Sequence, residues 1–214
     1  MQQILVYADS LSWGIIPDSR DRFPFDQRWP GVMELELAAL GERVRVVEDC
    51  LNGRRTVWED PFKPGRNGLA GIEQRIEVNS PLSLVILFLG TNDFQVMHEH
   101  KPWHAAQGIA AIVSAIRRAP LEPGMPIPQI LVVAPPPLQK AKGAIAPKFD
   151  GAELKAVGLT SAIEGVAAEH HCLFFDAGSV TSTSVVDGVH LDADQHGILG
   201  KALAWHVKSL LSPA

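Results

Sequence analysis

Cysteine is scarce in this chain of 214 residues. Cys50 and Cys172 are too few for a disulfide framework, and neither belongs to a Cys-x-x-Cys pair. We expect both to be small buried side chains in a reducing compartment. The sequence also opens without a basic segment followed by an apolar one, which disfavours a secretory leader. These absences predict a soluble cytoplasmic protein.

Long apolar runs and basic runs are missing as well. No apolar stretch approaches the roughly 20 residues that a membrane-spanning helix needs. The 19 basic residues are outnumbered by 24 acidic ones, so the net charge is −5. Nucleic-acid-binding surfaces need clustered positive charge, and this composition therefore disfavours a nucleic-acid partner as well as a membrane one. Internal repeats are absent too, and the length predicts one domain over residues 1–214.

Short apolar runs and amphipathic segments alternate along the chain. The runs are continuous and rich in β-branched or aromatic residues, as expected of strands buried on both faces. They cover residues 4–7, 44–47, 82–89, 129–134 and 172–175. Helical spacing of apolar residues occurs between and after them, over residues 29–40, 68–78, 102–118, 151–170 and 192–211. This alternation predicts an α/β fold, a three-layer α/β/α sandwich with a five-stranded parallel sheet.

Chemically active residue types follow the predicted strands or precede the last helix. They are Asp9, Ser10, Gly53, Asn92, Asp187 and His190. Ligands of open α/β sheets bind outside the carboxyl ends of the strands, so we expect these residues to meet at one edge. Two proline-containing segments, residues 16–27 and 135–148, follow the first and fourth strands. We expect them to border the site, although plain surface loops are the alternative.

Serine, histidine and aspartate in this arrangement indicate acyl transfer. Ser10 is the expected nucleophile, His190 the general base and Asp187 the residue that orients the imidazole. One loop can present both Asp187 and His190, with Gly188 allowing the turn. The developing oxyanion needs preorganised donors, which we assign to the backbone N–H groups of Ser10 and Gly53 and to the Asn92 side-chain amide. Each motif alone is weak, because an Asp-Ser pair after a strand is more often a turn or a helix cap.

Further residues beside the motifs are candidates for binding or support. We predict substrate contacts for Trp13, Asp9 and Arg54, with core packing as the alternative for Trp13. Asp9 is also expected to accept backbone N–H bonds and so hold the loop of the nucleophile. Arg54 is expected to pair with Asp93 or Asp49, and a solvated charge is the alternative.

The chain resembles the SGNH hydrolases, also called GDSL-type esterases. The resemblance rests on four blocks that occur in the family's order, namely residues 9–14 (Asp-Ser-Leu-Ser-Trp-Gly), Gly53, residues 90–93 (Gly-Thr-Asn-Asp) and residues 187–190 (Asp-Gly-Val-His). It implies a flavodoxin-like sandwich and a serine mechanism that needs no metal or other cofactor.

Within the family the sequence looks most similar to the bacterial arylesterase/acyltransferase and carbohydrate acetylesterase branch. The supporting segments are Arg28-Trp29, Asn52-Gly53-Arg54, residues 135–138 (Pro-Pro-Pro-Leu) and residues 175–179 (Phe-Asp-Ala-Gly-Ser). This similarity implies a small-molecule ester substrate with a short acyl group, acetylated carbohydrates or aryl acetates above all, and acyl transfer as a side activity. It also implies a homo-oligomer, often an octamer.

Ala8 is the main departure from the family pattern, which has glycine there. A methyl group forbids little at a residue with negative φ, so we expect Ser10 to remain active. A carbohydrate-binding pseudoenzyme is the alternative that this alanine raises. A lysophospholipase- or thioesterase-type lipid hydrolase is another, although the polar loop gives no sign of a long apolar groove.

Two other catalytic architectures are disfavoured. The chain has no Gly-x-Ser-x-Gly elbow, the signature of the α/β-hydrolase fold. His98, His100 and His104 cluster after the third block, but no His-Glu-x-x-His motif occurs, so no metal site is predicted.

Overall fold

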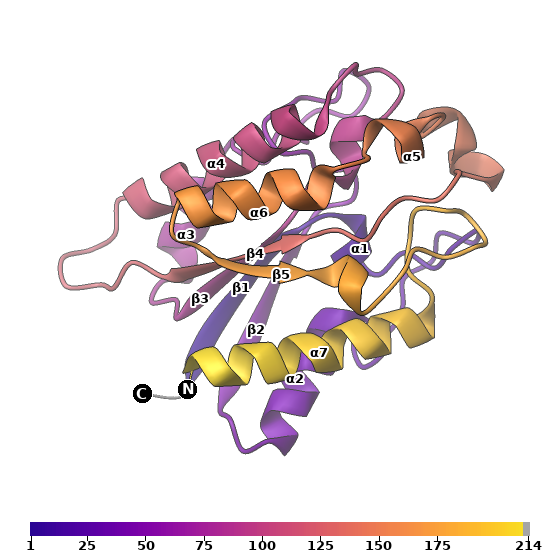
Figure 1. Ribbon diagram of the computed structural model, residues 1–214. Helices are drawn as coiled ribbons and strands as arrows, with labels where there is room; N and C mark the ends of the chain where they lie inside the picture. Colours follow the sequence, from indigo (N-terminus) through magenta and orange to yellow (C-terminus); the bar gives the residue numbers. More distant parts are fainter. Residues whose placement is uncertain (212–214) are drawn as a thin grey trace.

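A five-stranded sheet with helices on both faces forms the centre of the protein, as the computed structural model shows for residues 1–211 (Figure 1). All strand pairs are parallel, and the strand order is β2-β1-β3-β4-β5. The strands are β1 (Gln2–Ala8), β2 (Val44–Cys50), β3 (Leu84–Phe88), β4 (Gln129–Ala134) and β5 (Leu173–Asp176). The predicted three-layer α/β/α class is therefore confirmed.

Alternate side chains of each inner strand enter two separate cores, because successive side chains point to opposite faces of a sheet. Leu5 and Tyr7 of β1 pack into one core, while Ile4 and Val6 pack into the other. The first core is covered by α3 (Ile72–Asn79), α4 (Pro102–Arg118) and α6 (Leu159–Glu169). The second is covered by α2 (Trp29–Ala39) and α7 (Ala193–Leu211), which pack against each other (Figure 1). Burial on both faces explains why the strands are continuously apolar.

The predicted helix over residues 151–170 is wrong, because the segment forms two helices. α5 (Ala152–Lys155) is followed by a break, and α6 begins only at Leu159. Gly158 at the break has φ +90°, a left-handed conformation that no regular helix contains. Similarly, the helix predicted to begin at residue 68 begins at Ile72, after Gly71 with φ +77°.

The loops after the strands gather at the carboxyl edge of the sheet, where short helices follow directly on the strands. α1 (Ser10–Trp13) follows β1 after one residue, and the 3₁₀ helix η1 (Thr91–Phe94) follows β3. The segment after β4 ends in a second 3₁₀ helix, η2 (Gly143–Lys148). Cys50 and Cys172 are free thiols, but both are partly exposed rather than buried. Within residues 1–211, no helix is long and apolar enough to cross a membrane.

Candidate active site

Ser10 lies at the first position of α1, held there by the residue before it. Asp9 is the N-cap of the helix, and its Oδ1 accepts a hydrogen bond of 2.9 Å from the Leu11 N–H. Such a cap satisfies one of the N–H groups that a helix start leaves free. Gly14 ends the helix after a single turn in the left-handed conformation. The short turn brings Ser10 Oγ to 3.2 Å from Nε2 of His190.

The other ring nitrogen of His190 meets Asp187. His190 Nδ1 lies 2.6 Å from Asp187 Oδ2, while Asp187 Oδ1 accepts the N–H groups of Val189 and His190, each at 2.9 Å. Burial would raise the pKa of Asp187, but its hydrogen bond with His190, the charge of His190 and the two backbone N–H bonds together lower it. An ionised carboxylate is therefore available to accept the Nδ1 proton and stabilise an imidazolium.

The loop that carries Asp187 and His190 is clamped by the segment after β4. The carbonyl of Gly188 accepts the Gln139 N–H at 3.0 Å, and the carbonyl of Asp187 accepts the Lys142 N–H at 3.0 Å. Gly188 has φ +78°, and a Cβ there would lie 2.5 Å from the carbonyl oxygen of Lys140. Only glycine combines this backbone conformation with so close an approach. The predicted border segment 135–148 thus contacts the site directly.

The three residues predicted as oxyanion donors border one small cavity. Ser10, Gly53 and Asn92 line it together with His190, and its volume is about 70 Å³. Asn92 Nδ2 donates one hydrogen bond of 2.8 Å to Asp9 Oδ2, and Asn92 Oδ1 accepts one of 2.7 Å from Gln95 Nε2. An amide nitrogen carries two hydrogens, so Asn92 keeps a second donor besides the one given to Asp9.

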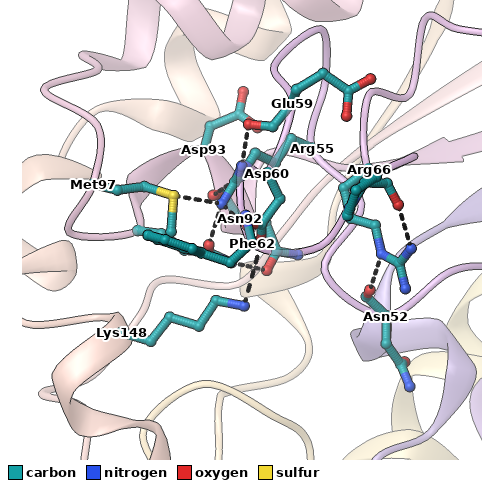
Figure 2. A network of polar contacts seen from close by, with 12 residues as sticks. Asn52, Arg55, Glu59, Asp60, Phe62, Arg66, Asn92, Asp93, Met97 and Lys148 are labelled. Atoms are coloured by element: carbon teal, nitrogen blue, oxygen red, sulfur yellow. Dashed lines mark hydrogen bonds and ion pairs between the residues drawn. The ribbon is translucent and has the colours of Figure 1, made fainter.

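Arg55 supports the Asn92 side-chain amide through Gln95, by contacts that the sequence did not predict. The guanidinium is fully buried, and its Nη2 donates to Gln95 Oε1 at 2.5 Å. The same Nη2 donates to Asp60 Oδ2 at 3.2 Å, and Figure 2 shows Arg55 beside Asp60. Its Nε donates to the backbone carbonyl of Asn92 at 3.3 Å. Because Arg55 can only donate, it requires Gln95 to turn its oxygen inward and its NH₂ group toward Asn92. The sequence contains no motif that marks Gln95 or Arg55.

Arg54, a predicted substrate contact, is held by protein partners away from the cavity. Its Nη2 lies 2.7 Å from Asp49 Oδ1, its Nη1 donates to the Ala8 carbonyl at 2.9 Å, and its guanidinium stacks 3.9 Å from the centroid of the Tyr7 ring. The side chain is only 5% exposed and does not line the cavity. Of the two partners predicted for it, Asp49 is the one found. Asp93 instead accepts hydrogen bonds from Thr56.

Asp9 and Trp13, the other two predicted substrate contacts, do not line the cavity either. Asp9 is 1% exposed, and burial raises its pKa to about 7 against the opposing effect of its hydrogen bonds with Leu11 and Asn92. The Asp9 carboxyl group thus holds the loop that carries Ser10, which is the second role predicted for it. Trp13 lies beneath the Arg22 guanidinium at 4.7 Å and is not among the residues that line the cavity.

The histidine cluster after η1 forms a ring stack. The His98 and His100 rings lie 4.5 Å apart, and His100 lies 4.2 Å from the Trp58 ring. Burial lowers the pKa of His98 to about 4 and also lowers that of His100. Across residues 1–211, no group of three or more His, Cys, Asp or Glu side chains is arranged to hold a metal ion.

Solved structures similar to this one include two kinds of esterase. The inhibitor-bound aryl esterase of M. smegmatis is 36% identical, with a TM-score of 0.93 over 99% of this chain and 100% of that chain. Est24, a carbohydrate acetylesterase from Sinorhizobium meliloti, is 32% identical, with a TM-score of 0.92 over 99% and 100% of the two chains. A carbohydrate acetylesterase family member from the same organism is 34% identical, with a TM-score of 0.91 over 99% of each chain.

The family itself is established by the sequence match. No curated protein sequence matches this chain, but residues 9–198 match the GDSL-like lipase/acylhydrolase family. The match begins at Asp9, includes Ser10, Gly53 and Asn92, and extends past His190. The predicted resemblance to SGNH hydrolases, and to their arylesterase and carbohydrate acetylesterase members, is confirmed. The chain belongs to the GDSL-like lipase/acylhydrolase family and is a carboxylic ester hydrolase.

Proposed function

We propose that the protein is a serine esterase that hydrolyses short-chain acyl esters through an acyl-enzyme intermediate. One observation carries the proposal: Ser10 Oγ is hydrogen-bonded to the His190 ring, and the same ring is hydrogen-bonded to the Asp187 carboxylate. Ser10 and His190 line the same small cavity. Nucleophile, base and orienting acid are then within reach of one bound carbonyl group.

The chemistry follows from this geometry in two steps. Ser10 Oγ attacks the ester carbonyl and gives its proton to His190 Nε2, while the carbonyl oxygen becomes an oxyanion that accepts hydrogen bonds from the Ser10 and Gly53 N–H groups and from Asn92. The intermediate then collapses, the C–O bond to the alcohol breaks, and His190 returns the proton to the departing alcohol. In the second step water attacks the acyl-enzyme with His190 again as base, which releases the acid and restores Ser10.

Short acyl groups fit the cavity better than long ones. Its volume of about 70 Å³ matches an acetyl-sized group. The arylesterase and carbohydrate acetylesterase neighbours support aryl acetates or acetylated carbohydrates as substrates. The partner is thus a small-molecule ester. A larger apolar hollow of about 320 Å³ lies between residues 135–138 and 156–161, and it is the feature that would favour a lipid or thioester substrate.

Two measurements test this function. Acetyl release from acetylated sugars and aryl acetates should fall to the uncatalysed rate in Ser10→Ala, and a serine-reactive phosphonate should label the native chain but not this variant. A series of p-nitrophenyl esters should show falling kcat/KM with increasing chain length. Preference for long chains would favour the lipid hydrolase instead, and absence of labelling would favour the carbohydrate-binding pseudoenzyme.

Acyl transfer is proposed as a side activity, since a site that excludes water allows an alcohol to compete for the acyl-enzyme. Adding an alcohol to the ester assay and quantifying the new ester against free acid measures that competition.

We further propose one domain over residues 1–214 and a homo-oligomer, with an octamer as the expected state. Large apolar side chains that stay exposed support self-association, because such side chains often mark interfaces. Examples are Phe62 at 84%, Trp103 at 63% and Val185 at 66% exposure. Light scattering coupled to size-exclusion chromatography gives the molar mass, and a monomer at all concentrations would refute the oligomer.

A further inference from the structure

Three positively charged side chains line the cavity that contains Ser10 and His190. They are Arg20, Lys63 and Lys148. Each comes from a different part of the chain: Arg20 from the segment after α1, Lys63 from the segment between β2 and α3, and Lys148 from the end of η2. No acidic side chain of the described residues lines this cavity with them. The chain as a whole has a net charge of −5, so this positive charge is local to the site.

Little negative charge neutralises these cations. The side chains of Arg20 and Lys63 are both exposed. Within residues 1–211, neither side chain makes a hydrogen bond or ion pair with the protein. Lys148 Nζ lies 3.9 Å from Asp60 Oδ2, and a dashed line in Figure 2 marks this ion pair. Asp60 is already bonded to the buried Arg55, so its single charge faces two cations. Asp18 borders an adjoining hollow with Arg20 but forms no ion pair with it.

The cations also affect one another. Burial, followed by the positive charges of Arg66 and Arg20, lowers the pKa of Lys63, while the charge of Asp60 opposes the shift. Burial likewise lowers the pKa of Lys148, against the charge of Asp60, and Arg55, Lys63 and Arg20 lower it further. Such mutual repulsion between like charges is relieved when an anion binds among them. The arrangement is therefore complementary to a negatively charged ligand.

We propose that the preferred ester carries an anionic group, such as a carboxylate, close to the scissile bond. The inference rests on the proposed esterase function and narrows its substrate class. Arg20, Lys63 and Lys148 would bind the anionic group while Ser10 attacks the carbonyl carbon. A guanidinium and two ammonium groups are the donors that proteins use for carboxylate and phosphate oxygens.

Matched substrate pairs test the inference. 4-Acetoxybenzoate and its neutral analogue 4-acetoxybenzamide place the charge on the alcohol side, whereas p-nitrophenyl hemisuccinate and p-nitrophenyl butyrate place it on the acyl side. The kcat/KM ratio of the anionic to the neutral member is measured for each pair, after correction for the rates of alkaline hydrolysis. The variants are Lys63→Met, Arg20→Met and the double variant, with Arg118→Met as control. Arg118 is exposed at the end of α4, away from the cavity, and its loss changes the net charge equally.

The expected result is a ratio above one in at least one pair. That ratio should fall by about two- to fivefold for each cation removed, which is the range for exposed charge pairs, and should fall with added salt. Arg118→Met should leave it unchanged. Equal ratios in native and variant proteins, or equal loss for both members of each pair, would overturn the inference. Ser10-dependent hydrolysis of the neutral esters would still support the esterase, whereas its absence would refute the esterase itself.

Discussion

Replacing Ala8 by glycine tests whether the chain's departure from the family pattern affects the reaction. Ala8 is the last residue of β1, is fully buried, and pairs with Cys50 and Phe88 on the neighbouring strands. It is not among the described non-glycine residues with positive φ, so its methyl group causes no backbone strain. Loss of one buried methyl group costs about 0.8 kcal/mol. Glycine in a strand costs roughly 0.5–1 kcal/mol more. Ala8→Gly should therefore lower the free energy of unfolding by about 1–2 kcal/mol.

The catalytic rate should change far less than the pattern would suggest. The Ala8 carbonyl accepts the Leu51 N–H at 3.0 Å and an Arg54 N–H at 2.9 Å, so contacts that glycine keeps hold the backbone before Ser10. We expect kcat/KM for an aryl acetate to change less than about tenfold, well below the ~10²-fold effect of a lost oxyanion donor. Urea denaturation measures the stability. Ala134→Gly, at the buried end of β4, is the matched control. A gain of 10²-fold in Ala8→Gly alone would refute the reasoning, since it would mean that the methyl group obstructs the oxyanion.

Three further predictions follow from the supporting contacts. Gly188→Ala places a Cβ 2.5 Å from the Lys140 carbonyl oxygen. We therefore expect kcat/KM to fall more than about tenfold, while the circular dichroism spectrum stays unchanged. Native activity would contradict the inference that residues 139–142 hold the loop of Asp187 and His190 in place. Gln95→Leu removes the hydrogen bond to Asn92 Oδ1 and so frees the Asn92 amide to rotate. We expect kcat to fall by about 10-fold or more while KM stays nearly unchanged. A change in KM alone would contradict the role of Gln95 in orienting Asn92. Burial raises the pKa of Asp93 from 3.8 to about 6, although its hydrogen bonds with Thr56 oppose the shift. Between these two pH values the folded state therefore binds more protons at Asp93 than the unfolded state does. The free energy of unfolding should then fall as the pH rises from about 4 to about 6. Denaturation at several pH values should show this fall reduced in Asp93→Asn, and an unchanged slope would contradict the assignment.

The strands, and the sheet edge that holds the candidate site, could be predicted from the sequence. Strands buried on both faces must be apolar throughout, and the predicted segments 129–134 and 102–118 agree with β4 and α4 to the residue. The edge follows from topology, since parallel strands place all their carboxyl ends together. The break at Gly158 escaped prediction because the apolar spacing continues through it, from Ala152 to Leu159 and Ile163, which are all buried in the same core. Hydrophobic periodicity records which face is buried, and it does not record a left-handed residue between two helices.

Arg54 and Arg55 illustrate what sequence could not resolve. Both are nearly fully buried basic side chains beside the second motif, yet Arg54 pairs with Asp49 on β2 whereas Arg55 reaches Gln95 and Asp60. Gln95 lies 40 positions along the chain from Arg55, so no local pattern relates the two. A buried guanidinium lowers the stability of the fold unless its N–H groups find hydrogen-bond acceptors. Gln95 must therefore turn its Oε1 toward Arg55. That orientation in turn directs the NH₂ group of Asn92 toward Asp9 and the cavity. Asn92 of the third motif, the proposed oxyanion donor, is thus oriented by the charge of Arg55, which lies next to the second motif. Only the folded sheet brings the two motifs together.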